Sequence, residues 1–153
     1  MRKACLVVLA GFMAAPALGQ EDSTKATVEA VEACKAISST FTEVSECLPG
    51  MDVALASLAA FSEIYPAAAQ PLKDRCLELN EHQIGADSCV RKAIESALSL
   101  SDAMPDGSAL DDPLFESIKS KADFERLEAA RSEAKAKFPP NSGSGFVMYQ
   151  PYR

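Results

Sequence analysis

Two stretches of equal length, CKAISSTFTEVSEC at residues 34–47 and CLELNEHQIGADSC at residues 76–89, each begin and end with a cysteine. The only other cysteine, Cys5, lies in an N-terminal segment that we expect to be removed. Four remaining cysteines in an exported chain predict two disulfides. A zinc site is a poorer explanation, because the chain has no C-x2-C pair and only one histidine.

The first 19 residues have the three regions of a secretory signal peptide. Arg2 and Lys3 precede an apolar run over 5–15, and the small residues of Ala17-Leu18-Gly19 predict cleavage before Gln20. The apolar run is too short for a membrane anchor, which needs about 20 apolar residues. We therefore expect a periplasmic or secreted protein. It consists of a signal peptide (1–19), a helical domain (20–138) and a flexible tail (139–153).

The charge balance is acidic, with a formal net charge of −7 for the whole chain. Removing Arg2 and Lys3 leaves 13 basic and 22 acidic residues, so the expected exported chain carries 13 − 22 = −9. This balance argues against nucleic-acid binding and against attachment to anionic lipid, both of which depend on Lys and Arg. It is compatible with a basic protein partner.

Apolar residues recur every three or four positions, and no segment alternates over the length of a strand. This predicts an all-α fold, a small disulfide-linked bundle of four to five helices. Pro49-Gly50, Pro66, Gly85 and Pro139-Pro140 are the expected stops, and Pro71, Asp87 or Ser88, and Asp112-Pro113 the expected starts. The five expected helices cover roughly residues 24–48, 51–65, 71–84, 88–101 and 113–138.

The pairing of the cysteines depends on whether the first helix is continuous. An unbroken helix from Cys34 to Cys47 rises about 20 Å, whereas a disulfide needs Cα atoms about 4.4–6.8 Å apart. We therefore expect a nested pairing of Cys34 with Cys89 and of Cys47 with Cys76. The alternative is local pairing within each stretch. It requires a break near Ser38–Thr42, where Ser and Thr weaken the helix, and a turn at Gly85.

Few residues suggest chemistry. His82 has no nucleophile motif around it, and we expect it to face solvent. Acidic pairs such as Glu43/Glu46 suit solvated helix faces, and residues 102–112 lack the ligand pattern of an EF-hand. P-loop, dinucleotide and C-x-x-C motifs are missing from the sequence. We therefore predict no catalytic, cofactor-binding or metal-binding residues.

One resemblance covers roughly residues 30–98. Cys34 followed by Thr40-x2-Glu43-x3-Cys47, an Ala/Leu-rich helix and two further cysteines resembles the LprI-type lysozyme inhibitor family of small, exported, helical bacterial proteins. The resemblance implies a periplasmic protein that binds and blocks a lysozyme. The positions it carries over are Cys34, Cys47, Cys76 and Cys89, which we interpret as structural, and Thr40 and Glu43, which we interpret as making local backbone or helix contacts.

These observations predict a non-enzymatic binding protein of the bacterial cell envelope, with a basic protein such as lysozyme as its partner. Two alternatives remain open at this point. One is a small periplasmic scaffold or stress protein that binds through its tail. The other is a glycan hydrolase that uses carboxylates such as Glu43 or Glu46. The sequence gives no indication of the oligomeric state.

Overall fold

The computed structural model describes residues 25–105 and 110–138, and within these ranges every regular element is a helix. The elements in chain order are α1 (Val28–Ile37), α2 (Phe41–Ile64), the 3-10 turn η1 (Ala67–Ala69), α3 (Gln70–Leu79), α4 (Gln83–Ala103), α5 (Pro113–Ile118) and α6 (Lys121–Ala136). The predicted all-α, disulfide-linked bundle is confirmed, with six α-helices in these ranges instead of four or five. The predicted signal peptide and tail lie outside the described residues.

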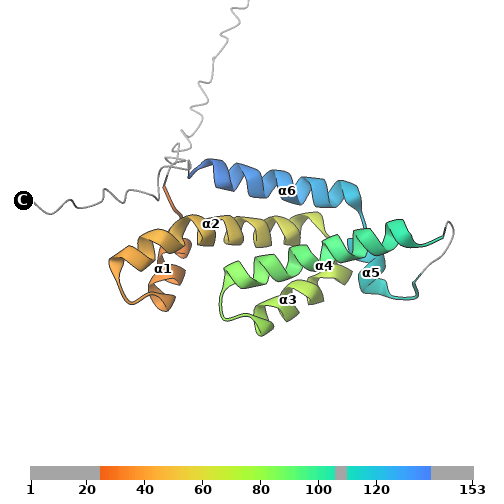
Figure 1. Ribbon diagram of the computed structural model, residues 1–153, viewed down its shortest axis with the longest axis horizontal. Helices are drawn as coiled ribbons and strands as arrows, with labels where there is room; N and C mark the ends of the chain where they lie inside the picture. The colour runs from red at the N-terminus through yellow and green to blue at the C-terminus, as the bar shows by residue number, and fades with distance from the viewer. Residues whose placement is uncertain (1–24, 106–109, 139–153) are drawn as a thin grey trace, which may run out of the picture.

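Helix α2 is the central element of the bundle (Figure 1). It packs against α1 over its first half, and it contacts both α4 and α6. Its buried side chains include Met51, Ala54, Leu58 and Phe61, which recur every three or four residues. This spacing keeps one face of the helix turned into the core.

The break at residues 38–40 separates α1 from α2. Ser38 has an extended backbone, and Thr40 caps the new helix by accepting a hydrogen bond at Oγ1 from the Glu43 amide at 3.2 Å. The Glu43 carboxylate accepts in return from the amides of Thr40 and Ser39, at 3.1 and 2.6 Å. This reciprocal arrangement is a capping box, and it satisfies amides that a helix start leaves free. The expectation of one helix over residues 24–48 is therefore wrong.

The disulfides are local. Cys34 is bonded to Cys47 and Cys76 to Cys89, with Cα atoms 5.8 and 5.7 Å apart. The nested pairing of Cys34 with Cys89 and Cys47 with Cys76 is wrong, because it assumed a continuous first helix. The break at 38–40 folds α1 back on α2, and a second break at 80–82 folds α3 back on α4. Each disulfide closes one helical hairpin.

Pro49 and Gly50 do not end a helix, as we had expected, but lie inside α2. An interior proline costs on the order of 3 kcal/mol because it removes one backbone hydrogen bond and crowds the preceding turn. The carbonyl that loses its donor belongs to Ser45, whose side chain is exposed. The helix continues into a buried stretch, Met51 to Ala54, and this burial offsets the cost.

The turn between α3 and α4 differs from the expected one. Asn80 is the C-cap of α3, and its Nδ2 donates to the Cys76 carbonyl at 2.7 Å. His82 is the N-cap of α4, and its Nδ1 accepts from the Gly85 amide at 3.3 Å. Gly85 therefore belongs to the first turn of α4 and does not cap α3. A Cβ at Gly85 would lie 2.7 Å from Oδ1 of Asn80, so any other residue here would have to displace the Asn80 side chain from its capping position.

Asp112 caps α5 as predicted, by accepting from the amides of Leu114 and Phe115 at 2.8 and 3.3 Å. The expected single helix over 113–138 is wrong, because α5 ends at Ile118 and Ser120 starts α6 by accepting from the Asp123 amide at 3.3 Å. The short α5 thereby buries Phe115 and Ile118 at one end of the bundle.

The core has two parts. The larger part gathers side chains from α2 to α6, including Leu58, Phe61, Tyr65, Val90, Ile94, Phe115, Ile118 and Leu127. The smaller part lies under the first hairpin, where Ala30, Cys34 and Met51 are surrounded by Val44, Leu48 and Ile84. Because Ile84 belongs to α4, the second hairpin also covers this smaller core.

Among the described residues, α2 alone is long and apolar enough to cross a membrane by length and composition. This test is weak evidence, because the core helix of a soluble protein passes it too. Its contacts with α1, α4 and α6 and its buried Asp52 are those of a core helix in this fold.

Tyr65 provides a test of this core. Its ring stacks on Phe61 with centroids 4.7 Å apart, and its hydroxyl has no hydrogen-bond partner in the part of the chain that the structure describes. Burial, with a smaller contribution from the charge of Asp123, raises the pKa of Tyr65 from 10.0 to about 12. Because the folded-state pKa is raised, its contribution to stability is complete below pH 10 and is lost between about pH 10 and 12.

We therefore expect Tyr65→Phe to leave the free energy of unfolding at pH 7 unchanged or slightly higher, since it removes an unpaired buried hydroxyl. Between pH 10 and 12, stability of the unmodified protein should fall by up to about 1.4 kcal/mol per pH unit more than that of the variant. Urea unfolding at several pH values measures both. If the stability of the two proteins depended equally on pH, the raised pKa of Tyr65 would be contradicted.

Candidate functional site

The tip of the first hairpin presents apolar side chains to solvent. Phe41, the first residue of α2, is 89% exposed, and Ile37, the last residue of α1, is 48% exposed. Both lie inside the 14-residue loop closed by the Cys34–Cys47 disulfide, next to the capping box of Thr40 and Glu43. The predicted motif residues are thus part of the framework that holds an exposed aromatic side chain.

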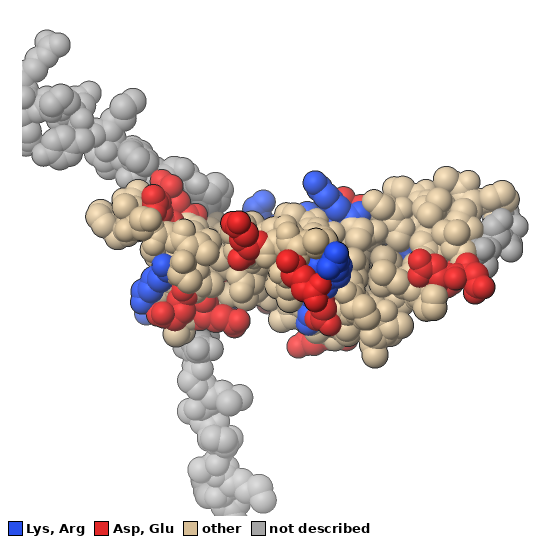
Figure 2. Space-filling view, turned by 90° about the horizontal axis from the view of Figure 1, so that it is seen from below, with Lys and Arg blue, Asp and Glu red and all other residues tan. Residues whose placement is uncertain are grey.

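The same hairpin is acidic. Residues 28–48 contain four glutamates and one lysine, a formal charge of 1 − 4 = −3. Glu32 is paired with Lys35 at 2.8 Å, and Glu43 is engaged in the capping box, while the Glu46 side chain is exposed. Figure 2 shows carboxylates at this end of the molecule, and others along the middle and at the opposite end of the same face. Phe41 and Ile37 therefore lie on a hairpin that carries a net negative charge.

A cavity of about 260 Å³ lies where α2, the start of α4 and the end of α6 meet. Its apolar lining comes from Pro49, Gly50, Val53, Ile84 and Phe138. Its polar lining comes from Asp87, Ser88, Arg131 and Lys135. A mixed lining of this kind suits a small ligand with both an apolar and a charged part.

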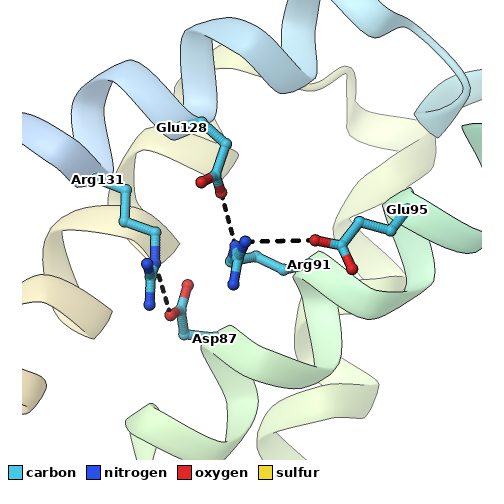
Figure 3. A network of polar contacts seen from close by, with 5 residues as sticks. All are labelled: Asp87, Arg91, Glu95, Glu128 and Arg131. Atoms are coloured by element: carbon cyan, nitrogen blue, oxygen red, sulfur yellow. Dashed lines mark hydrogen bonds and ion pairs between the residues drawn. The ribbon is translucent and has the colours of Figure 1, made fainter.

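Next to this cavity, long arginine side chains connect α4 and α6 (Figure 3). Arg131 Nε on α6 lies 3.2 Å from Asp87 Oδ2 on α4, and Arg91 Nε on α4 lies 2.6 Å from Glu128 Oε1 on α6. Arg91 also contacts Glu95, one turn further along α4, at 3.3 Å. The two helices contact α2 far more than each other, so these ion pairs are their main polar connection.

In this network the charge of Arg91 is well compensated, whereas the carboxylate of Asp87 is only partly hydrogen-bonded. Burial by itself lowers the pKa of the Arg91 guanidinium, but the hydrogen bond and charge of Glu128, with the charges of Glu95 and Asp87, raise it above its ordinary value. Arg91 therefore stays protonated. Asp87 is buried, with a side chain 4% exposed, and its Oδ1 has no hydrogen-bond partner among the described residues.

A second buried carboxylate, Asp52, ties both ends of the described chain to α2. Its Oδ1 accepts from the Thr27 amide at 2.8 Å, and its Oδ2 lies 3.9 Å from Lys137 Nζ. The sequence analysis identified neither Asp52 nor Asp87 as special. A signal was present, because each acid lies within the apolar spacing of its helix, where a solvated carboxylate does not fit.

Ser62 and Lys73 line a second cavity of about 280 Å³ between α2 and α3. Lys73 Nζ donates to Ser62 Oγ, and Ser62 Oγ in turn donates to the Leu58 carbonyl at 3.1 Å. A serine nucleophile needs the reverse arrangement, in which its own proton is directed at a base. As it stands, this pair is a structural contact between two helices.

The remaining predicted residues have local roles. His82 is half-buried and caps α4, whereas we had expected it to face solvent. All four cysteines of the two stretches are bonded to one another in pairs. In the described ranges, no group of three or more His, Cys, Asp or Glu is arranged to hold a metal ion. Part of the acidic loop considered for calcium lies outside those ranges.

No protein-family model matches the chain, and searches of curated proteins and of solved structures return no match either. The resemblance to the LprI-type family therefore stays a prediction.

The Asp87–Arg131 pair leads to a prediction about the free energy of unfolding. Arg131→Met leaves a buried carboxylate without its cation and should cost about 3–5 kcal/mol of unfolding free energy. Asp87→Ala leaves an arginine that is 27% exposed and can be hydrated, so it should cost less, about 1–3 kcal/mol.

Urea unfolding measures both variants, with Glu95→Gln as a control. Glu95 makes an exposed pair within one helix, and its loss should change stability by no more than about 0.5 kcal/mol. Equal costs for Arg131→Met and Glu95→Gln would show that the Asp87–Arg131 pair contributes no more than an exposed pair.

Proposed function

We propose that this chain is an exported, non-enzymatic binding protein of the bacterial cell envelope, and that it binds a basic protein through the tip of the α1–α2 hairpin. Lysozyme is the partner that the family resemblance suggests. The observation that carries the proposal is Phe41, a large aromatic side chain that is 89% exposed inside a disulfide-closed loop.

Aromatic residues are frequent among those that dominate binding energy. Ile37 widens the apolar surface, and both side chains are anchored on helix ends that a disulfide and a capping box hold in place. A loop that is ordered before binding loses little conformational entropy on docking. The tip therefore has the construction of a preorganised binding element.

The charge of the hairpin supports the choice of partner. Its formal charge of −3 attracts a positively charged surface and repels an acidic one. Complementary charge of this kind accelerates association, and salt weakens the effect. A negatively charged hairpin with an exposed aromatic side chain at its tip thus fits a basic protein that offers a pocket for one aromatic ring.

The compartment supports the proposal too. Two disulfides are typical of proteins that fold in an oxidising environment. The signal-peptide features of residues 1–19 agree with this, because they indicate export. A periplasmic or secreted location would place the protein where lysozymes act on cell walls.

The test is a turbidity assay in which several lysozymes lyse cell-wall substrate with and without the oxidised protein. We expect lysis by at least one lysozyme to slow in proportion to the protein added. Phe41→Ala should weaken this inhibition at least tenfold, the loss expected when a central aromatic contact is truncated. Glu46→Lys should weaken it less, and mainly at low salt.

The matched control is Leu79→Ala, which truncates a side chain that is 63% exposed at the end of α3, in the other hairpin. It should leave inhibition unchanged, and thermal unfolding should confirm that neither exposed substitution alters the fold. No slowing of lysis at excess protein would exclude lysozyme as the partner. Equal effects of Phe41→Ala and Leu79→Ala would exclude the hairpin tip as the binding surface.

A further inference from the structure

The cavity between α2, α4 and α6 has a cationic wall. Arg131 and Lys135 are four residues apart and lie one above the other on α6, and both line the cavity. Arg131 uses only Nε to contact Asp87, at 3.2 Å. Its two terminal nitrogens and the Lys135 ammonium have no acceptor in the described part of the chain. The negative charge of Asp87 balances the positive charge of Arg131, so the charged lining residues carry a net charge of +1.

The opposite side of the cavity is apolar. Pro49 and Val53 come from α2 and Ile84 from α4, while Phe138 lies at the end beyond α6. An inorganic anion would satisfy the cations and leave this apolar surface uncovered. A hydrocarbon would cover the surface and leave the cations without a counter-charge. Only a ligand with one anionic group and an apolar body matches both walls.

The volume limits the size of that ligand. At about 30 Å³ for each water in the liquid, 260 Å³ corresponds to roughly nine water volumes. A single ring or a branched chain with one carboxylate suits a space of this size. Arginine and lysine favour a carboxylate here, since the guanidinium can form two parallel hydrogen bonds to its oxygens.

We propose that this cavity binds a small carboxylate with an aromatic or branched aliphatic body. The carboxylate lies between Arg131 and Lys135, and the apolar body covers Pro49, Val53 and Ile84. Such a group can be a free acid or the C-terminal residue of a peptide. The site is separate from the hairpin tip and does not depend on binding of a basic protein.

The test is isothermal titration calorimetry of the oxidised protein with 3-phenylpropionate. We expect binding at least tenfold tighter than that of 3-phenylpropionamide, which lacks the charge, or of propionate, which lacks the ring. A parallel titration with the tripeptide Ala-Ala-Phe and its C-terminal amide distinguishes the two sources. Tighter binding of the tripeptide acid than of 3-phenylpropionate would identify a peptide terminus as the ligand, and the reverse order would identify a free acid.

Variants then locate the site. Lys135→Gln should weaken binding of 3-phenylpropionate about tenfold without disturbing the fold, because the Lys135 side chain is exposed and makes no hydrogen bond or ion pair in the described ranges. Ser88→Trp, at an exposed lining position, should fill the cavity and abolish binding. The matched control is Arg126→Gln, a charge loss on the same helix outside the cavity, which should leave binding unchanged.

Three results would overturn the proposal. One is no detectable binding of either acid at millimolar concentration. Another is equal binding of acid and amide. The last is equal weakening by Lys135→Gln and Arg126→Gln, which would indicate a general charge effect instead of a site.

Discussion

A disulfide bonds two Sγ atoms and requires their Cα atoms to lie about 4.4–6.8 Å apart, and this distance limit determines how the chain is arranged. Thirteen residues of continuous helix would separate Cys34 from Cys47 by about 20 Å, so their bond exists only because the helix breaks at Ser38–Thr40. The second pair requires the same kind of break at residues 80–82. Each bridge then closes a short loop and removes conformational freedom from the unfolded chain.

Helices α1, α4 and α6 pack against α2, the second helix of the first hairpin. Helix α2 continues through Pro49 and carries Met51, Leu58 and Phe61 into the two parts of the core. Asp52 on the same helix ties down the residues before α1 and after α6. The cavity lined by Arg131 and Lys135 and the exposed Phe41 both follow from this arrangement. One lies beside the middle of α2 and the other at its first residue.

Much of the local structure could be predicted from the sequence. Helical spacing predicted the all-α fold, Pro66 marks the end of α2, and Asp112-Pro113 marks the start of α5. One error occurred where a local rule competed with tertiary packing, and another where a local signal was overlooked. Pro49-Gly50 is a strong stop signal, but burial of the next four residues keeps the helix intact. Thr40 and Glu43 form a capping box that was visible in the sequence, and recognising it as a helix start would have predicted the local disulfide.

The binding surfaces were harder to predict. The exposure of Phe41 depends on the direction in which α1 folds back. The cavity depends on α6 lying alongside α2, near the start of α4, and no local pattern specifies either arrangement. The Asp87–Arg131 and Arg91–Glu128 pairs connect residues 37 to 44 positions apart in the chain. Charges on solvated helix faces occur throughout this sequence, and only the fold distinguishes these four.

The central structural claim is that each disulfide closes its own hairpin, and tryptic mapping of the unreduced protein tests it directly. Cleavage after Lys25, Lys35, Lys73, Arg75 and Arg91 places Cys34 and Cys47 on peptides 26–35 and 36–73, and both Cys76 and Cys89 on peptide 76–91. The structure predicts that 26–35 is linked to 36–73, while 76–91 is recovered alone with an internal bridge. Recovery of all three peptides joined in one species would contradict the local pairing and the hairpins built on it.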